Sequence, residues 1–575
     1  MLQINKRARL ALVLTLFSLV LAACGSDNTP VPAATTSAAA ATTGATATTA
    51  AAVSTTAASA TTGAATTVAG STTTSAAPTA AGTANTAAAA AGPRGQTLTV
   101  AVASFPASLD PGTGDPVNEP FLTPAYDSLL RFDADGNYQP MLATSWKWVG
   151  TDFKTFELQL RPNVKFSDGS TFDANAVKSW LELQKTNKTV TAANIGLDTA
   201  EVTGPLTIQL HLAQPNSLLP TFLTRNWISG IIACPAAVTN ADLVKTATCG
   251  VGPYTLDTKN TVSGDTYTYL PNPNYWNQDA IHWNKLVMKV VANPQAALDA
   301  LKTGQVQVVA PADASVVDAA VSAGLKQAGV DLNVQGLDFL YKDGTLTPAL
   351  KDPRVRQALN YAIDRNALSK LLAGGKGRPI STQFLPGSDG YDASLDNYYT
   401  YDVAKAKQLL SDAGFANGFE VSILSAPFLG FDTLAQAVSA YWQSIGVKTT
   451  IDSKASLAEF VGGLSSGKYA TAVAGLGAVS PTLITWNCCM KPGATWNPDK
   501  TAAPELQALI DKLGATDATN MPATAKQVNK YLTEQAWYLP VIATKLYFLY
   551  DPRVTGVTPT ATEPVINLMD IKPAA

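Results

Sequence analysis

The stretch from Asn28 to Pro93 contains no charged side chain, no aromatic ring, no leucine and no isoleucine. Almost all of it is Ala, Thr, Ser and Gly. Such a segment cannot bury enough apolar surface to offset the ordering of its backbone, which costs about 1 to 2 kcal/mol per residue. We therefore expect residues 24–95 to form a disordered tether, with a root-mean-square reach of about 45 Å. The alternative, an alanine-rich helix, is disfavoured by the interspersed Thr and Gly.

Residues 1–23 precede this tether and are typical of an export signal. Lys6, Arg7 and Arg9 form a basic start, and Leu10 to Ala23 form an apolar stretch. As a helix, that stretch rises about 21 Å, short of the ~30 Å hydrocarbon core of a bilayer. The pattern therefore predicts a signal peptide rather than a stable membrane span.

The end of this segment, Leu21-Ala22-Ala23-Cys24-Gly25, resembles the bacterial lipoprotein box. The resemblance implies that Cys24 is acylated and becomes the mature first residue. The alternative is a chance cysteine at an ordinary cleavage site. Because two or more acyl chains anchor a protein stably where one does not, we expect a lipid-anchored protein outside the cytoplasmic membrane, periplasmic or on the cell surface.

The part of the chain after residue 95 is acidic. The whole chain of 575 residues has a formal charge of −3. Residues 1–95 contain several of its basic residues, so the remaining part has a more negative net charge. Nucleic-acid phosphates need a basic footprint, so this balance argues against a nucleic-acid partner.

Short strands alternate with amphipathic helices in this part, the pattern of mixed α/β proteins with large sheets. Alternating apolar residues predict strands at 96–103, 153–160 and 207–212, and a hairpin over 254–270 that turns at Ser263-Gly264-Asp265. Capping residues and terminal glycines predict helices at 352–374, with Leu371 on its buried side, 402–414 and 432–446, the last followed by a strand at 447–451. No internal repeat is evident.

A set of collinear motifs resembles the extracytoplasmic solute-binding proteins of ABC importers, specifically family 5, the peptide- and nickel-binding type. The motifs cover nearly all of residues 96–575, and they are Tyr126–Leu130, Pro140–Ala143, Leu160–Gly169, Gly250–Tyr254, Asn272–Trp276, Asp352–Leu359, Tyr361–Arg365 and Ala404–Leu410. Most of them consist of turn residues and packing aromatics, so we interpret them as scaffold.

The resemblance implies an α/β fold of the type II periplasmic-binding-protein class, with two lobes joined by a hinge and an extra inserted domain. We expect lobe one at 96–137, 229–325 and 536–575, the inserted domain at 138–228, and lobe two at 326–535. It further implies a monomeric binding protein that closes on a small solute, peptide-like or saccharide, and then docks on ABC permease and ATPase subunits. The chain itself lacks a GxxxxGK[ST] phosphate loop.

In the family, a second-lobe loop carries an aspartate that holds the peptide α-amino group. At the corresponding segment this chain has Leu476-Gly477-Ala478-Val479, with Leu476 in place of tryptophan and Val479 in place of aspartate. The family arginine that pairs with a dipeptide carboxylate would fall near Leu429 and Gly430. A desolvated ion without a partner costs several kcal/mol. We therefore predict that a free di- or tripeptide is not the best ligand, and that a longer or modified peptide, an oligosaccharide or another neutral solute fits better.

The remaining candidates for a ligand cleft are aromatic and polar. They are Phe105, Trp227, Asp338, Tyr341 and Trp486, together with Leu476, Gly477, Ala478 and Val479. Aromatic faces suit both sugars and apolar peptide side chains. Each aromatic residue has a core-packing alternative, and Asp338 has the alternative of a solvated turn.

Two pairs of cysteines follow Cys24. Cys234 and Cys249 are close enough in sequence for a disulfide that closes a short loop, worth about 3 kcal/mol in the entropy model. The alternative is two buried thiols. The adjacent Cys488 and Cys489 leave open either a vicinal disulfide or two loop thiols.

An enzyme is not expected. Only His211 and His282 are present, and neither has a nucleophile motif or a metal-ligand partner at helical spacing. We therefore expect no catalytic residue, no cofactor and no metal, nickel included. The alternatives that stay open are an oligosaccharide-binding member, a sensory binding protein and, least favoured, a secreted glycosidase that works with two carboxylates.

Overall fold

The computed structural model describes residues 95–575 apart from 114–117, 428–429, 478–480, 495, 500–502 and 575. The leader, the tether and Cys24 therefore lie outside the described residues. Eleven strands form one mixed sheet: β1 (Leu98–Val102), β8 (Tyr254–Leu256), β9 (Thr266–Pro271), β10 (Leu286–Val290), β11 (Val308–Ala312), β12 (Lys326–Phe339), β13 (Arg378–Pro379), β14 (Glu420–Ser425), β15 (Lys448–Ser453), β16 (Thr471–Gly477) and β17 (Tyr538–Tyr550). Their order is β15-β14-β16-β12-β17-β11-β1-β10-β9-β8, with β13 paired to β17.

The two longest strands, β12 and β17, connect the two ends of this sheet. They are antiparallel neighbours over almost their whole length, from Lys326 opposite Tyr550 to Asp338 opposite Tyr538. On its outer side β17 pairs with β11, whereas β12 pairs with β16. The register shifts between Asp331 and Asn333, which leaves Leu332 out of the ladder. The β12–β17 ribbon therefore carries the main-chain connection between the two ends.

Two large hydrophobic cores form on this sheet. The first gathers buried side chains from residues 98–310 and 548–571. It includes a separate four-stranded sheet in the order β4 (Ala143–Trp148), β5 (Thr155–Leu160), β7 (Thr207–Leu212) and β6 (Leu197–Gly204). The second core gathers side chains from 337–542, together with Leu218 and Phe222 from an earlier part of the chain. The domain boundaries expected from the sequence stay a prediction.

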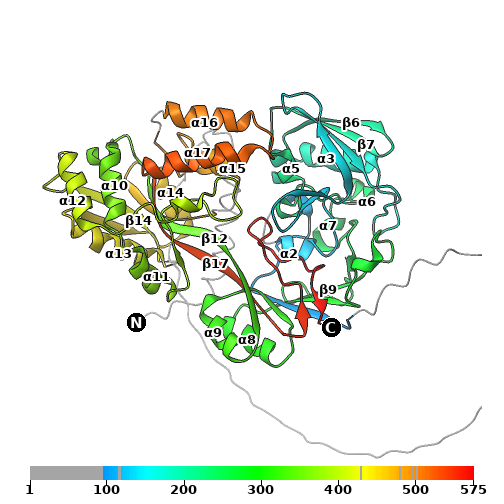
Figure 1. The fold of residues 1–575 in the computed structure, drawn as a ribbon. Coiled ribbons are helices and arrows are strands. Elements are labelled where there is room, and N and C mark those ends of the chain that lie inside the picture. Colours follow the sequence, from blue (N-terminus) through cyan, green and yellow to red (C-terminus); the bar gives the residue numbers. More distant parts are fainter. Residues whose placement is uncertain are drawn as a thin grey trace, which may run out of the picture. The chain divides into compact units, whose positions relative to one another are not determined.

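Helices cover both cores (Figure 1). Those that contribute to the second core are α10 (Pro353–Tyr361), α11 (Arg365–Ala373), α12 (Val403–Asp412), α13 (Phe431–Gln443), α14 (Leu457–Leu464), α16 (Pro504–Gly514) and α17 (Met521–Glu534). Two short helices also meet this core: α5 (Leu219–Phe222) adds Phe222 to it, and α15 (Thr482–Thr485) packs against it. The others are α2 (Glu119–Leu122), α3 (Ala174–Thr186), α4 (Val190–Ile195), α6 (Pro235–Thr239), α7 (Leu243–Thr246), α8 (Pro294–Lys302) and α9 (Val317–Ser322). Short strands complete the described part: β2 (Leu130–Phe132), β3 (Tyr138–Pro140), β18 (Val554–Thr555) and β19 (Lys572–Pro573).

The prediction of a single helix over 352–374 is wrong, because the chain forms two helices there. Asp352 caps α10 by accepting a hydrogen bond from the Arg354 amide, as the Asp-Pro pair predicts. The helix stops at Ala362, and the side chain of Asp364 accepts from the Ala367 amide to start α11. The second capping aspartate, Asp364, thus divides the predicted helix into two. Leu371, expected on the buried side, is 58% exposed.

The buried arginines of the two helices fasten them to β17. Arg365 donates from all three guanidinium nitrogens to the carbonyls of Asn360, Ile380, Tyr399 and Pro540 and to the side-chain oxygen of Asn360. Arg356 donates to the carbonyls of Leu350, Lys351, Gln535 and Ala536. Burial lowers the pKa of each guanidinium to about 10. The hydrogen bonds offset this cost and fix the position of the strand relative to the helices.

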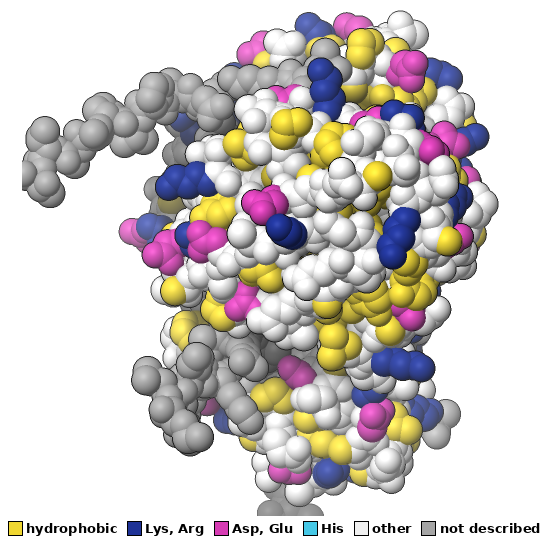
Figure 2. Space-filling model, turned by 90° about the vertical axis from the view of Figure 1, so that its left-hand side faces the viewer, with side chains coloured by type: hydrophobic (Ala, Val, Ile, Leu, Met, Phe, Trp, Pro, Cys, Tyr) yellow, Lys and Arg dark blue, Asp and Glu magenta, His cyan; other side chains and the backbone are white. Residues whose placement is uncertain are grey.

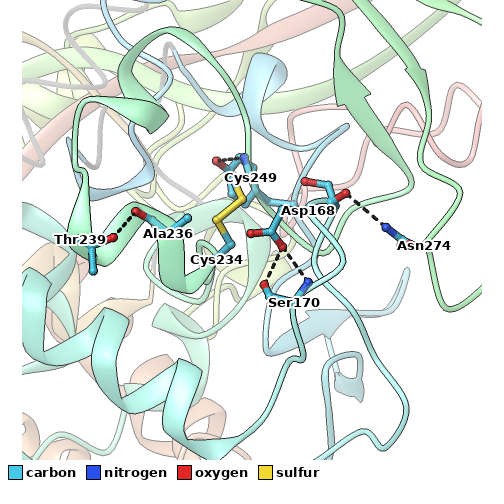
Figure 3. Close-up of a disulfide and its surroundings, with 9 residues drawn as sticks. Asp168, Ser170, Cys234, Ala236, Thr239, Cys249 and Asn274 are labelled. Atoms are coloured by element: carbon cyan, nitrogen blue, oxygen red, sulfur yellow. Dashed lines mark hydrogen bonds between the residues drawn. A yellow bond between two sulfur atoms is a disulfide. The ribbon is translucent and has the colours of Figure 1, made fainter.

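The disulfide between Cys234 and Cys249 lies within the first core and closes a loop there, with the two Cα atoms 5.5 Å apart (Figure 3). The Asp168 carboxylate lies close to both sulfurs. Since those sulfurs are bonded to each other, this group does not form a metal site. Asp168 instead accepts hydrogen bonds from the amide and the hydroxyl of Ser170 in the turn that contains Gly169.

The surface carries charges of both signs. On the face that Figure 2 shows, which is the left-hand side of Figure 1, basic and acidic side chains are interspersed and apolar groups lie between them. None of the helices within the described ranges combines the length and the apolar character that crossing a bilayer requires.

Replacing Arg365 with lysine is expected to lower the free energy of unfolding by about 3 kcal/mol. A lysine ammonium keeps the charge but cannot reach all of the carbonyls that the guanidinium bonds. Urea denaturation measures the change. The matched control is Arg354→Lys, because the Arg354 side chain is half exposed. Equal stabilities of the two variants would contradict the role assigned to Arg365.

Candidate functional site

A cavity of about 980 Å³ lies where the two cores approach each other. The first core contributes Val100, Phe121, Met288 and Phe548 to its wall, and the second contributes Leu218 and Met521. The irregular part of the β12–β17 ribbon also lines it, through Leu332 and Asn333 on β12 and Thr544, Lys545 and Leu546 on β17. The cavity therefore borders the ribbon that joins the two ends of the sheet.

Much of the lining is aromatic. The rings come from Phe121, Phe132, Tyr138, Trp146, Trp227, Tyr391 and Phe548. Trp227 packs edge-on against Phe222, with ring centroids 5.2 Å apart. The Tyr138 hydroxyl hydrogen-bonds to Thr221 Oγ1 at 2.7 Å, and burial raises the pKa of this tyrosine to about 12. The volume and this lining fit an organic molecule of moderate size.

Glu119, in the first turn of α2, is a buried carboxyl in the wall. It is 4% exposed, and its Oε1 has no hydrogen-bond partner among the described residues. Burial raises its pKa to about 8, while the charge of Arg225 lowers it and that of Glu563 raises it. At neutral pH this carboxyl is therefore mostly protonated and can act as a hydrogen-bond donor as well as an acceptor.

A buried network lies behind Glu119. Arg225 pairs with Glu563 at 3.1 Å and donates to the carbonyl of Val565. The neighbouring Asn226 donates its Nδ2 to the carbonyl of Thr562. The amide oxygen of Asn226 is buried and has no partner in the described part of the chain. Asn226 and Thr562 both line the cavity.

Asp389 lies in the wall contributed by the loop after β13. Its Oδ1 accepts from the backbone amide of Thr482 at 2.8 Å and from the hydroxyl of the same residue at 2.6 Å. Its Oδ2 is buried and has no hydrogen-bond partner within the described ranges. Burial raises the pKa of Asp389, and the bonds from Thr482 and the Gly390 amide lower it. Asp389 thus lines the cavity, while this oxygen lies buried within the wall.

The walls meet at Gly387. A Cβ placed on this residue would lie 2.1 Å from the Cβ of Ala561, a distance that two carbon atoms cannot adopt. Gly387 also has a φ of +98°, which glycine tolerates and other residues rarely adopt. The Ala561 methyl group in the segment near the carboxyl terminus therefore packs directly against the backbone of Gly387 in the loop after β13.

Of the residues singled out in the sequence, Trp227 lines the cavity. Phe105 is 52% exposed and lies outside the lining. Trp486 is buried in the second core, and Tyr341 packs against that core. Leu476 and Gly477 end β16, but their side chains are not described, and Ala478 and Val479 lie outside the described residues.

Asp338 occupies β12 rather than a solvated turn. It is 2% exposed, and burial raises its pKa to about 7, although nearby Lys342 lowers it. The Lys342 ammonium donates to the carbonyl of Phe339 and to Asn497 Oδ1 and lies over the ring of Trp537. This group belongs to the second core. Nearby, Cys489 is disulfide-bonded, whereas the side chain of Cys488 is not described.

The sequence analysis missed Glu119, Asn226 and Asp389. Each is a polar residue in an irregular or very short element, where periodicity gives no information about burial. A faint signal exists for Asp389, because Pro386-Gly387-Ser388-Asp389-Gly390 is a turn-rich stretch between apolar residues.

The family model described as bacterial extracellular solute-binding proteins, family 5 Middle, matches residues 137–486. Among curated proteins, the glutathione-binding protein GsiB of Salmonella paratyphi A is 27% identical over 494 residues, covering 80% of this chain and 91% of that protein. The GsiB of Escherichia coli K12 is 27% identical over 499 residues with the same coverage.

Solved structures share the fold. HbpA2 of Haemophilus parasuis superimposes with a TM-score of 0.75 at 20% identity, covering 84% of this chain and all of that one. The periplasmic binding protein DppA of Helicobacter pylori, solved with the peptide STSA, gives a TM-score of 0.64 at 20% identity, covering 84% of this chain and 99% of that one.

The raised pKa of Glu119 predicts how stability depends on pH. In the unfolded chain this carboxyl titrates near 4.5, and in the folded protein near 8, so the folded state binds more protons between these values. The free energy of unfolding therefore falls as pH rises through this window, by at most about 1.4 kcal/mol per pH unit from this group. Glu119→Gln is expected to remove this loss and to be the more stable protein at pH 8.

Thermal denaturation from pH 5 to 9 measures the difference between the wild type and Glu119→Gln. Asp135→Asn is the control, because Asp135 lines the same cavity but is exposed. Wild-type and Glu119→Gln profiles that stay parallel over the whole range would show that the carboxyl is not held protonated.

Proposed function

The chain belongs to the bacterial extracellular solute-binding proteins of family 5, which serve ABC importers, and we propose that it captures an oligopeptide-type or related organic solute by lobe closure while anchored through Cys24. It is a binding protein and not an enzyme. The fold class expected from the sequence, type II periplasmic binding protein, is confirmed.

The cavity between the two cores is the observation that carries the proposal. Its wall is drawn from both cores, so a solute inside it contacts both and stabilises their approach. The β12–β17 ribbon is the element that must bend, and its register shift beside Leu332 lies at the cavity. Closure presents a new surface to the permease, which distinguishes the loaded protein from the empty one.

The basic residues that line the cavity limit the class of ligand. No arginine lines the cavity in the described ranges, and the two lysines that do, Lys526 and Lys545, are exposed. The carboxylate of a free dipeptide would therefore lose water without gaining a buried cation. We propose that a free di- or tripeptide is a weaker ligand than a longer or modified peptide or a related solute whose carboxylate is absent or stays in solvent.

Native mass spectrometry of the purified full-length chain is expected to show one retained small molecule per protein. After that molecule is removed and added back, the radius of gyration from X-ray scattering is expected to fall, because the two halves close on it. A solute returned chemically altered, or a radius that no solute changes, would falsify the proposal.

A matched pair of variants tests closure itself. Gly387→Val places a side chain where the walls meet and is expected to weaken solute binding at least about tenfold more than Gly375→Val. Both glycines have positive φ, but a Cβ on Gly375 meets nothing within 4 Å, so the pair separates backbone strain from the wall contact. Equal effects of the two variants would show that the contact at Gly387 plays no part in binding.

Cys24→Ala is expected to release the protein from the membrane fraction, because the proposed acyl chains are its anchor. Metabolic labelling with an alkyne fatty acid, followed by detection on the purified protein, measures acylation directly. Labelling that persists in the variant would place the lipid on another residue and contradict the role of Cys24.

A further inference from the structure

One end of the eleven-stranded sheet is open. Strand β15 pairs with β14 on one side, and no described strand pairs with its other side. Its pairing with β14 is parallel and runs without a register shift from Glu420 opposite Lys448 to Ser425 opposite Ser453. The strand also lacks proline, so two features that commonly block an edge are missing from its described residues. β15 therefore offers an edge over its whole length.

Alternate residues of β15 direct their main-chain groups outward from this edge. The amide of Lys448 donates to the carbonyl of Phe419, on the β14 side. Because this direction alternates along a strand, Thr449, Ile451 and Ser453 direct their N–H and C=O groups to the opposite side. Those groups have no main-chain partner within the described ranges. A further strand would find three consecutive bonding positions there.

The two ends of the sheet differ in how accessible they are. At the far end, β8 has only three residues, and Tyr254 and Leu256 in it are buried. In β15 every residue is exposed except Thr449, which is half-buried. The exposed residues include an apolar one, Ile451, at 37%. Of the two ends, β15 is therefore the one that a strand from another molecule can reach.

The charges along β15 are complementary to the same strand running in the opposite direction. Lys448 and Asp452 lie on one face of the strand, with Thr450 midway between them. When two copies pair antiparallel with Thr450 opposite Thr450, each Lys448 lies opposite the partner's Asp452. In the same register the outward groups of Thr449 meet those of the partner's Ile451. Hydrogen bonds and charges thus agree in one arrangement.

The adjacent two-fold register is disfavoured by charge. If it were centred on Ile451, Lys448 would lie opposite the partner's Lys454, and like charges directly opposite each other are destabilising. A lysine on an edge strand commonly discourages pairing. Here Lys448 discourages one register and favours the other.

We propose that two copies of this chain associate through their β15 edges, antiparallel and with Thr450 at the two-fold axis. The interface is small, so the dimer is weak and depends on concentration, and the monomer expected from the sequence is its dilute form. Residues 448–453 do not line the cavity, so both copies keep their cavities accessible. The proposal does not depend on which solute the protein binds.

Sedimentation equilibrium of the purified full-length chain measures the association. The average mass is expected to rise from one chain toward two as the concentration increases to about 200 µM, and to fall when salt is added. Lys448→Glu places like charges opposite each other and is expected to weaken association at least about tenfold. Adding Asp452→Lys to that variant is expected to restore association to within about threefold of the wild type.

The matched control is Lys407→Glu, which makes the same charge change at an exposed position on α12. It is expected to alter association by less than about twofold. Circular dichroism and melting temperature check that each variant is folded.

Cysteine cross-linking tests the register. In the proposed pairing the two Thr450 Cα atoms lie about 4.5 Å apart, so Thr450→Cys is expected to form a disulfide between copies under mild oxidation with copper phenanthroline in air. Lys448→Cys is the control, because it is exposed on the same face but the two copies of this residue lie about 13 Å apart. Both variants are made in a Cys24→Ala background, and that parent gives the blank on a non-reducing gel.

The proposal is overturned if the wild type stays monomeric up to about 200 µM, which would leave the edge to a strand from another protein. It is also overturned if Lys448→Glu associates as well as the wild type, or if the double reversal associates no better than Lys448→Glu. Cross-linking of Lys448→Cys as fast as that of Thr450→Cys would reject the register, and with it the proposed dimer.

Discussion

The pairing of β12 with β17 is the interaction on which the rest of the structure depends. These two strands carry the main-chain hydrogen bonds that connect the half of the sheet containing β14, β15 and β16 to the half containing β1 and β8 to β11. Main-chain bonds resist stretching but permit twisting, and the ladder is interrupted twice, beside Leu332 and between Gln335 and Gly336. The buried guanidiniums of Arg356 and Arg365 hold the start of β17 and the residues just before it against α10 and α11.

The cavity combines a rigid aromatic lining with polar groups that are left incomplete. A protein that only needed stability would have paired Glu119, Asn226 and Asp389 internally, since buried polar groups are normally satisfied. Instead, one oxygen of each stays buried without a partner in the described part of the chain.

Much of the fold could be predicted from the sequence because it rests on local patterns. Strands β1, β5 and β7 follow from alternating apolar residues, and α12 from the cap at Asp402 and the glycine at 414. The break between α10 and α11 was missed because the apolar spacing continues across Asp364, whose capping role depends on its backbone conformation. The candidate site was predicted far less well. Trp227 lines the cavity, but Phe105, Asp338 and Trp486 do not, because burial and position in the cavity arise from contacts between distant segments. Asp389 depends on Thr482, 93 residues away, which no local pattern reports.

The contact between Gly387 and Ala561 limits how this protein can be re-engineered as a biosensor. Gly387 has no side chain to remove and Ala561 has a single methyl group, so trimming the rim gains little room for a bulkier analyte. Enlargement has to come from apolar wall residues such as Met521, Leu218 or Phe132, whose truncation adds volume without disturbing the place where the halves meet.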